Sequence, residues 1–291
     1  MVQMYKGIDV SEHNGAIDWQ KVAASGISFA VIRAGLGCKS DARFEENIQG
    51  ASRAGLAVCV YWFAYALDVN GATKEADFCA KIIAPYGKRI QVYYDFEYDT
   101  ERYAAERNVQ YSKRSRTDII KAFCDRMKKH GYRCGVYINI DYLAYQTNRT
   151  ELSKYPLWLA AWATKTAVAS FADTRPEAVN MEYGKPEIWQ FGKTSVPGIA
   201  KMCDVDYCYS DMLRMAFASL PPLNELKRGD KCRVINPVTR GNKKRGRTYN
   251  GGWFTIYYDS YDVLSVSGDS VVIGIGNTVT AAVKREDLEK V

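Results

Sequence analysis

The segment YYDFEYDT, residues 93–100, places three carboxylates at alternate positions: Asp95, Glu97 and Asp99. The apolar residues before it predict a buried strand, and side chains two positions apart on a strand share one face. Two carboxylates that lie close together repel each other, which raises the pKa of one so that it can donate a proton. Glycoside hydrolysis uses such a pair, in which one protonated carboxyl donates to the leaving oxygen and another stays charged to stabilise the oxocarbenium-like centre. Asp99 follows the strand and is predicted to cap the next helix instead.

The sequence contains only two histidines, His13 in the polar turn SEHNG and His130 beside Gly131 at the predicted end of a helix. A histidine-rich metal site and Ser-His or Cys-His chemistry therefore find little support. Carboxylates are left as the best candidates for catalysis. We expect neither a metal nor a cofactor.

Short apolar runs rich in Val, Ile and aromatic residues predict strands buried on both faces. Helical patterns separate the first five runs, and each begins near an N-cap residue type and ends at glycine. This alternation indicates α/β class, as an incomplete parallel (β/α) barrel of about eight strands. The last three links are short or irregular, and a doubly wound open sheet is the alternative. The runs are residues 5–11, 28–35, 56–66, 89–97, 132–139, 156–163, 186–192 and 201–208.

The strands of a parallel barrel present their carboxyl ends at one mouth, where active sites form. Asp9 ends the first predicted strand, Asp95 and Glu97 end the fourth, and Asp206 ends the eighth. The first and eighth strands are neighbours in a closed barrel, so Asp9 and Asp206 are expected to approach each other. A single one of these acids could merely cap a helix or pair with a base. Aromatic residues near strand ends are candidate sugar-binding contacts: Tyr65, Tyr93, Tyr137, Trp162 and Trp189.

A change of pattern at residues 219–230, which contain two prolines, predicts a domain boundary. We expect a first domain at residues 1–218 and a second at residues 219–291. The second domain has several short predicted strands separated by Gly-containing turns, which indicates a small all-β barrel. Its residues 221–291 carry 12 Lys/Arg and 8 Asp/Glu, with a basic cluster at residues 240–247. That cluster is either a solvated loop or a binding site for an anionic polymer.

The chain has a net charge of +7, which suits an anionic partner such as a cell wall but does not by itself indicate nucleic acid. No apolar run is long enough to predict a membrane span. The first residues, MVQMYKGIDV, lack the apolar core of a secretory signal. We therefore expect synthesis in the bacterial cytoplasm, and eight cysteines without a C-x-x-C pair fit reduced thiols there.

Several motifs in order resemble glycoside hydrolase family 25, the endolysin-type lysozymes or N-acetylmuramidases. They are YKGIDVSEHNGAIDWQKVAASGISFAVIRAG, DARFEENIQGASRAGL, the D-x-E of YYDFE, GVYIN, PLWLAAW, IWQF and VDYC, and they extend over residues 5–212. The resemblance implies an incomplete α/β barrel that cleaves the β-1,4 bond between N-acetylmuramic acid and N-acetylglucosamine in peptidoglycan.

By this resemblance Glu97 is the proton donor, and Asp95 stabilises an intermediate assisted by the acetamido group of the substrate. Asp9 and Asp206 match the other two acids of the family's active site. The chain departs from the family pattern at Tyr207-Cys208, where the family often has an Asn after VD-x. It also has Tyr61-Trp62-Phe63 where the family often has a histidine.

The tail resembles the SH3-like wall-binding modules of such lysozymes, through YDVLSVSGDSVVIGIGNTVTAAVKREDL. This implies a second contact with the cell wall, through a secondary wall polymer. A phage or prophage endolysin, acting on the wall after release, is the resulting prediction. A chitin-type glycosidase and a non-catalytic wall-binding protein are the alternatives, and whether hydrolysis retains or inverts configuration stays open.

Overall fold

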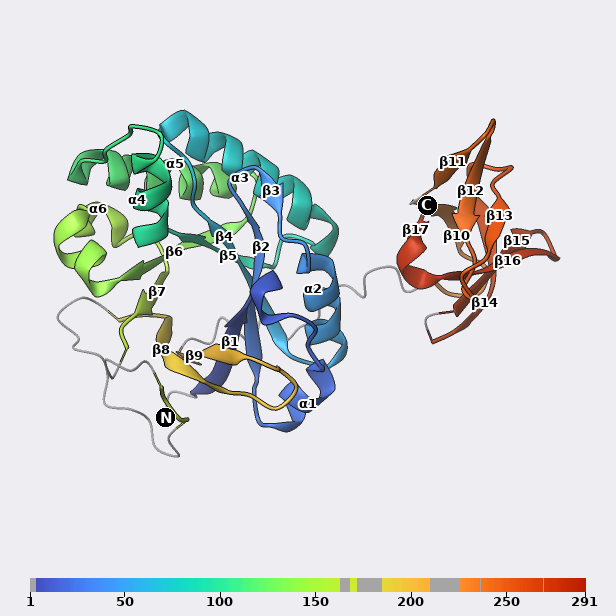
Figure 1. Ribbon diagram of the computed structural model, residues 1–291, viewed down its shortest axis with the longest axis horizontal. Coiled ribbons are helices and arrows are strands. Elements are labelled where there is room, and N and C mark those ends of the chain that lie inside the picture. The colour runs from blue at the N-terminus through green and yellow to red at the C-terminus, as the bar shows by residue number, and fades with distance from the viewer. Residues whose placement is uncertain (1–3, 163–167, 172–184, 210–225, 236, 269) are drawn as a thin grey trace. The chain divides into compact units, whose positions relative to one another are not determined.

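The computed structural model describes residues 4–162, 168–171, 185–209, 226–235, 237–268 and 270–291 (Figure 1). The chain forms two compact units, residues 1–221 and residues 222–291. The predicted boundary between residues 218 and 219 lies outside the described residues.

The first unit is a closed barrel of eight strands, which confirms the predicted α/β barrel and excludes the open-sheet alternative. β1 pairs with β2 and with β9, so the first and last strands of the barrel are neighbours as predicted. A short strand, β3 (Lys39–Ser40), extends β2 as a hairpin. The barrel strands are β1 (Tyr5–Val10), β2 (Phe29–Leu36), β4 (Ala57–Phe63), β5 (Gln91–Asp95), β6 (Arg133–Asn139), β7 (Leu157–Ala160), β8 (Ile188–Ser195) and β9 (Met202–Cys208).

One barrel strand departs from the predicted parallel arrangement, because β9 runs antiparallel to both β1 and β8. Only residues 196–201 join β8 to β9, and a parallel crossover needs a dozen residues or more. Gly198 lies in this link with φ of 97°, and a Cβ there would come within 2.4 Å of the backbone oxygen of Asp18. The link is therefore a tight hairpin packed against the start of the first helix.

The helices cover the outside of the barrel (Figure 1). The two longest, α3 and α5, begin at side-chain caps: Asp68 accepts from the backbone of Gly71, and Ser112 accepts from that of Ser115. No helix in the described ranges is long and apolar enough to cross a membrane. The helices are α1 (Trp19–Ala24), α2 (Phe44–Arg53), α3 (Val69–Ile83), α4 (Tyr98–Ala105), α5 (Lys113–Lys129) and α6 (Arg149–Leu152), with single turns at Glu12–Asn14, Ala84–Tyr86 and Tyr142–Gln146.

Large side chains fill the barrel interior below its mouth. Phe29, Tyr93 and Trp158 are buried there among aliphatic residues and thiols. Phe29 occupies this space because residue 7 of the neighbouring strand is glycine, and a Cβ there would lie 2.2 Å from the phenyl ring. The packed floor leaves room for polar groups only in the layer above it, at the carboxyl ends of the parallel strands.

The second unit is all-β and has its own hydrophobic core, which includes Cys232, Tyr261 and Val271. Its strands form a five-stranded sheet in the order β16-β15-β14-β10-β17 and a three-stranded sheet in the order β11-β12-β13. The small all-β fold of this unit is confirmed, and its SH3-like character stays a prediction. The strands are β10 (Lys231–Val234), β11 (Val238–Arg240), β12 (Lys243–Arg247), β13 (Trp253–Thr255), β14 (Tyr261–Ser267), β15 (Ser270–Ile275), β16 (Thr278–Lys284) and β17 (Leu288–Lys290).

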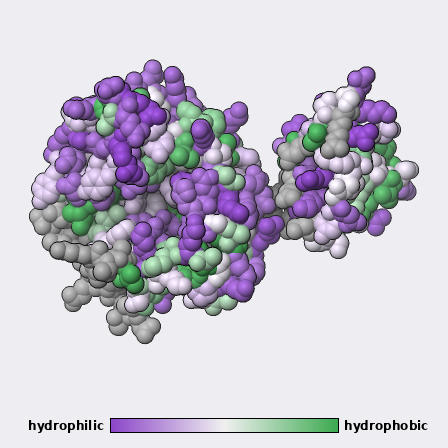
Figure 2. Space-filling model, viewed as in Figure 1, coloured by the Kyte–Doolittle hydropathy of each residue, from purple (hydrophilic) through white to green (hydrophobic). Residues whose placement is uncertain are grey.

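Hydrophilic residues cover much of the visible face of both units, and apolar residues are scattered between them (Figure 2). Such a surface is typical of a globular protein. The apolar residues of this face are interspersed with hydrophilic ones rather than gathered into one large patch.

Candidate active site

A cavity of about 570 Å³ opens at the barrel mouth. Residues near the carboxyl ends of β1, β2, β4, β5 and β6 line it, together with residues of β8 and β9. The lining includes Asp9, Asp95 and Glu97, three of the four predicted catalytic acids. The fourth, Asp206, is not among the residues that line it.

Asp95 and Glu97 reach this cavity because the chain stays extended across them. β5 ends at Asp95, which is 6% exposed, and Glu97 follows with φ of −145° and ψ of −170°. Phe96, between them, is fully buried against Tyr111 on the other side. The alternation expected from the sequence therefore places both carboxylates at the mouth.

Glu97 has the pKa of a group that donates protons near neutrality. Its pKa is raised from 4.5 to about 7, first by burial and then by the nearby charges of Asp99 and Asp204, while Arg102 and Lys193 lower it. Burial and then Glu97 also raise the pKa of Asp95 well above its ordinary value. The expected cause, repulsion between neighbouring carboxylates, is therefore not the main one for the pKa of Glu97, because burial contributes most.

Asp99 was expected to cap the helix that follows β5, and that expectation is wrong. The N-cap of α4 is Glu97, whose backbone N–H donates to the Thr100 hydroxyl at 3.3 Å. Asp99 lies in the first turn, forms an ion pair with Arg102 and lines the cavity. A carboxylate in the first turn interacts favourably with the helix dipole, and here its charge also raises the pKa of Glu97.

Asp9 and Asp206 approach each other as predicted, but at different depths. Asp9 accepts a hydrogen bond from Gln190 Nε2 at 2.9 Å, and Asp206 accepts one from Trp158 Nε1 at 2.8 Å. The second oxygen of Asp206, Oδ2, is buried and accepts no hydrogen bond from the described residues. Burial raises the pKa of both well above the ordinary value. After burial, the charges of Asp204 and Asp206 also raise the pKa of Asp9, so the two buried carboxyl groups oppose each other's ionisation.

The depth of Asp206 follows from the direction of β9. In the antiparallel register Asp206 lies opposite Gly7, and Asp204 lies opposite Asp9. Asp206 is completely buried, one layer below the mouth, rather than at a carboxyl end as the parallel barrel implied. Asp204 takes the place at the mouth and lines the cavity. The sequence interpretation missed Asp204, and the short link before β9 was the signal that could have revealed it.

The five predicted aromatic contacts divide into two groups. Tyr65, Tyr137 and Trp162 line the cavity. Tyr93 is fully buried in the barrel core against Trp158, because it lies on β5 two positions below Asp95. Trp189 alternates with Gln190 on β8, so it packs against Phe191 on the other face of the strand. Tyr93 and Trp189 are therefore packing residues, and the prediction of substrate contact is not supported for them.

Other cavity residues escaped the sequence interpretation. Arg33, 6% exposed, donates from Nε to Asp41 at 2.7 Å and from Nη2 to Glu12 at 2.9 Å, so its guanidinium is held in place. Gln190 bridges the site, because it also accepts from Tyr137 at 2.9 Å and from Trp162 at 3.2 Å. Tyr61 lines the cavity as well. Single polar residues on strands carry no periodic pattern that would have identified them.

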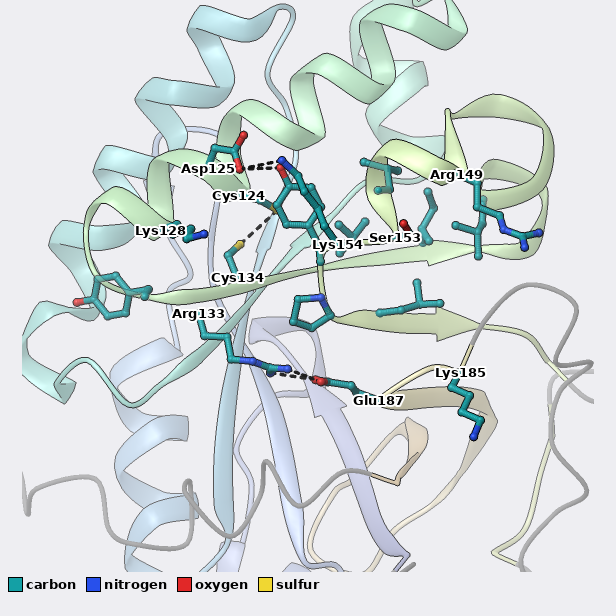
Figure 3. Close-up of a pocket in the computed structure, with 18 of the residues that line it drawn as sticks. Cys124, Asp125, Lys128, Arg133, Cys134, Arg149, Ser153, Lys154, Lys185 and Glu187 are labelled. Carbon is teal, nitrogen blue, oxygen red and sulfur yellow. Dashed lines mark hydrogen bonds and ion pairs between the residues drawn. The ribbon is translucent and has the colours of Figure 1, made fainter.

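A larger cavity of about 930 Å³ lies outside the barrel, beside α5, β6 and β7 (Figure 3). Figure 3 shows Arg133 and Glu187 turned toward each other, and they form an ion pair. Asp125 accepts a hydrogen bond from Tyr155 at 2.7 Å. Its carboxylates are thus engaged with donors, and none faces a second carboxylate as in the barrel mouth. Chemistry therefore places the candidate active site in the smaller cavity.

Over the described ranges, no three His, Cys, Asp or Glu side chains are grouped so as to hold a metal ion. The site offers acid–base groups: Glu97 with a pKa of about 7, buried Asp95 beside it, and the buried carboxyl groups of Asp9 and Asp206.

Comparison with known proteins now places the chain. The model of the family described as glycosyl hydrolases family 25 matches residues 8–199. The chain belongs to glycosyl hydrolases family 25. The matched range includes Asp9, Asp95 and Glu97, and it ends before Asp204 and Asp206.

Individual relatives within family 25 cover the chain unequally. Lysozyme M1 of Streptomyces globisporus is 40% identical over 76 residues, which is 26% of either chain. The modular autolysin LytC from Streptococcus pneumoniae has a TM-score of 0.59 and 27% identity, over 71% of this chain and 47% of LytC. The chain thus spans about a quarter of Lysozyme M1 and about half of LytC. A bacterial lysozyme from Streptomyces coelicolor has a TM-score of 0.57 and 24% identity, over 75% of this chain and 99% of that one, and supports the fold.

Proposed function

We propose that this family 25 chain is a peptidoglycan hydrolase that cleaves the β-1,4 bond between N-acetylmuramic acid and N-acetylglucosamine. The observation that carries the proposal is the position of Glu97 beside buried Asp95 at the barrel mouth, together with its pKa of about 7. Membership of a glycosyl hydrolase family supports cleavage of a glycosidic bond, and the structure of LytC in complex with a synthetic peptidoglycan ligand supports peptidoglycan as the substrate class. The similar structures include the autolysin LytC and the CTP1L endolysin, so bacterial and phage origins both fit.

Each acid has a proposed role in the reaction. Protonated Glu97 donates to the glycosidic oxygen as the bond breaks, and the resulting carboxylate then serves as base for the incoming water. Asp95 stabilises the positive charge that develops when the substrate's acetamido oxygen closes on the anomeric carbon. Asp9 holds Gln190, which orients Tyr137 and Trp162, and Asp206 lies buried beneath the site.

Product analysis tests this proposal. Purified peptidoglycan is digested and the fragments are analysed by mass spectrometry after borohydride reduction. We expect new reducing ends on muramic acid. New free amino groups without new reducing ends would instead indicate an amidase or peptidase. Equal cleavage of chitin oligomers would favour the chitin-type glycosidase, and the absence of any cleavage would favour a non-catalytic wall-binding protein.

The pKa of Glu97 predicts the alkaline limit of activity. The acid must be protonated in the free enzyme, so kcat/KM is expected to fall as the pH rises through about 7, approaching tenfold for each further pH unit. Asp99→Asn removes a charge that raises this pKa and is expected to move the limit to lower pH. The measurement is kcat/KM against pH at constant ionic strength.

A matched control separates this effect from the loss of a helical ion pair. Asp118 forms an exposed ion pair with Arg114 on α5, as Asp99 does with Arg102 on α4, but it does not line the cavity. Asp118→Asn should leave the pH limit unchanged. The assignment of Glu97 as the titrating acid fails if Asp99→Asn and Asp118→Asn have the same profile as the unmodified enzyme.

We propose that the second unit binds an anionic wall polymer through a cation row, defined as Lys243, Arg245 and Arg247 of β12. These residues share one face at a spacing of about 7 Å. The other face is covered at Gly246, where a Cβ would lie 2.5 Å from Phe254. Arg247 also lies over the Trp253 ring, 5.7 Å from its centroid.

The charges of this unit are divided between its two sheets, which supports the proposed row. Three carboxylates of the unit form ion pairs at the five-stranded sheet: Asp230 with Lys290, Asp262 with Lys231 and Glu289 with Arg233. In the described part of the unit, no carboxylate forms an ion pair with the cation row. A phosphate- or carboxylate-bearing polymer would complement it.

A triple variant tests the cation row. Lys243→Gln, Arg245→Gln and Arg247→Gln together are expected to weaken binding to purified walls at least tenfold and to reduce its salt dependence. Lys81→Gln, Lys113→Gln and Lys129→Gln form the control, with the same charge change on exposed lysines of α3 and α5. Equal weakening by both triple variants would show that binding depends on net charge and not on the cation row. Unchanged binding in the row variant would contradict the proposal that the row binds wall polymer.

A further inference from the structure

A bulge in β8 turns two polar side chains into the same cavity. Gln190 pairs with Asp206, and the next pairs along are Gly192 with Val205 and Lys193 with Asp204. Phe191 is the extra residue, and it stacks outside the barrel on Tyr207 with ring centroids 4.6 Å apart. In a regular strand, residues 190 and 193 would face opposite sides. Because of the bulge, both line the active-site cavity.

Lys193 and Asp204 therefore stand side by side at the mouth. Lys193 Nζ lies 3.9 Å from Asp204 Oδ1, too far for a hydrogen bond. Asp204 Oδ1 is buried, and none of the described residues forms a hydrogen bond with it. The same Nζ lies 5.0 Å from the centre of the Trp162 ring. The pair thus keeps an unused acceptor and a cationic donor next to an aromatic face.

An ion pair alone does not account for this arrangement. A half-exposed pair at such a distance contributes little to stability, and a buried oxygen without a donor is unfavourable. A ligand that presents an N–H and a carbonyl oxygen together would satisfy both side chains. That is the pattern of a secondary amide, and its methyl or methylene group would lie on Trp162.

We propose that Asp204 and Lys193 form an amide-recognition subsite, in which Asp204 accepts the N–H and Lys193 donates to the carbonyl oxygen of a substrate amide. This inference rests on the proposed hydrolase function and adds a specificity-determining pair to it. Peptidoglycan offers two sources of this chemistry: the acetamido group of a sugar and the amide that joins the stem peptide to the glycan.

Three variants isolate the subsite. Asp204→Leu removes the acceptor, Asp204→Asn keeps an acceptor oxygen but loses the charge, and Lys193→Met removes the donor. Each is assayed for KM and kcat on three substrates: intact peptidoglycan, glycan strands freed of stem peptides by an amidase, and the same strands after chemical N-deacetylation. Circular dichroism and thermal unfolding check the fold, and the Lys193→Met variant, at a more exposed position, serves if Asp204→Leu does not fold.

We expect Asp204→Leu and Lys193→Met to raise KM about tenfold or more with a smaller change in kcat, while Asp204→Asn retains most of the affinity. If the acetamido group is the ligand, the unmodified enzyme prefers acetylated strands and Asp204→Leu abolishes that preference. If the stem amide is the ligand, the KM effect is confined to peptide-bearing substrate.

The subsite is overturned if Asp204→Leu and Lys193→Met keep the KM values and substrate preference of the unmodified enzyme on all three substrates. That result leaves the hydrolase itself intact. Failure of the unmodified enzyme to cleave any of these substrates would instead contradict the proposed function, so the two outcomes are distinguishable.

Discussion

Glu97→Gln is expected to lower kcat on peptidoglycan about a thousandfold while wall binding and the fold are preserved. The substitution keeps the size of the side chain and removes the only proton that it can deliver to the leaving oxygen. A positioned general acid typically contributes about 10²–10⁴-fold, and Glu97 also serves as base in the second half of the proposed reaction. The measurement is the release of reducing ends by purified variant and unmodified enzyme, at pH 6 and at pH 8.

The control for this result is Glu106→Gln, at the end of the same helix. Its partner is exposed Arg107, and it does not line the cavity. It should therefore keep nearly full activity. Substantial activity in Glu97→Gln at both pH values would move the acid role elsewhere, with Asp95 the first candidate because its pKa is also raised.

Asp95→Asn is expected to lower kcat by a hundredfold or more and, at neutral pH, to stabilise the barrel. Its Oδ1 is buried without a hydrogen-bond partner in the described part of the chain, and burial raises the pKa of the group. The charge of Asp95 therefore lowers the stability of the fold. Catalysis needs this charge, and folding does not. We expect the midpoint of thermal unfolding to rise by a few degrees, at about 2–4 °C per kcal/mol for a domain of this size.

The direction of the pH dependence follows from linkage. The folded-state pKa of Asp95 lies above its unfolded value, so the unmodified protein is favoured below the unfolded pKa and loses stability as the pH rises toward the folded one. The advantage of Asp95→Asn should thus be absent near pH 3 and present at pH 7.5. Tryptophan fluorescence reports on the barrel, which holds five of the six tryptophans. A lower unfolding midpoint at pH 7.5 would show that the fold stabilises this charge.

Local patterns were sufficient to predict the fold because most of its strands are buried on both faces. Runs such as residues 56–66 are continuously apolar, and helices with glycine at their ends separate them. The alternation of Asp95 and Glu97 also survived folding, since it requires only that the chain stay extended for three residues. These features depend on neighbours in sequence, which the sequence displays directly.

The features of the site that the sequence did not predict depend on how distant parts of the chain are arranged in the folded barrel. Asp206 lies below the mouth and Asp204 at it because β9 is reversed, and the length of one link decides that reversal. Lys193 faces the cavity only because of a bulge, which no residue pattern marked. The pKa of Glu97 is governed first by burial, and burial is a property of the assembled barrel. Charge spacing along the chain could therefore suggest the acid but could not supply the cause of its acidity.

The pairing of β1 with β9 also constrains when this protein becomes functional during synthesis. Asp9 leaves the ribosome long before its neighbour Asp204, which comes from the last strand of the barrel. Until residues 188–208 emerge, β1 has only β2 beside it, and the mouth lacks Gln190, Lys193 and Asp204. The β8–β9 hairpin can form locally within microseconds, but it must then insert between β7 and β1. A nascent or truncated chain that stops before β9 would therefore carry Asp95 and Glu97 without an enclosed site, and the acids would remain hydrated and inactive.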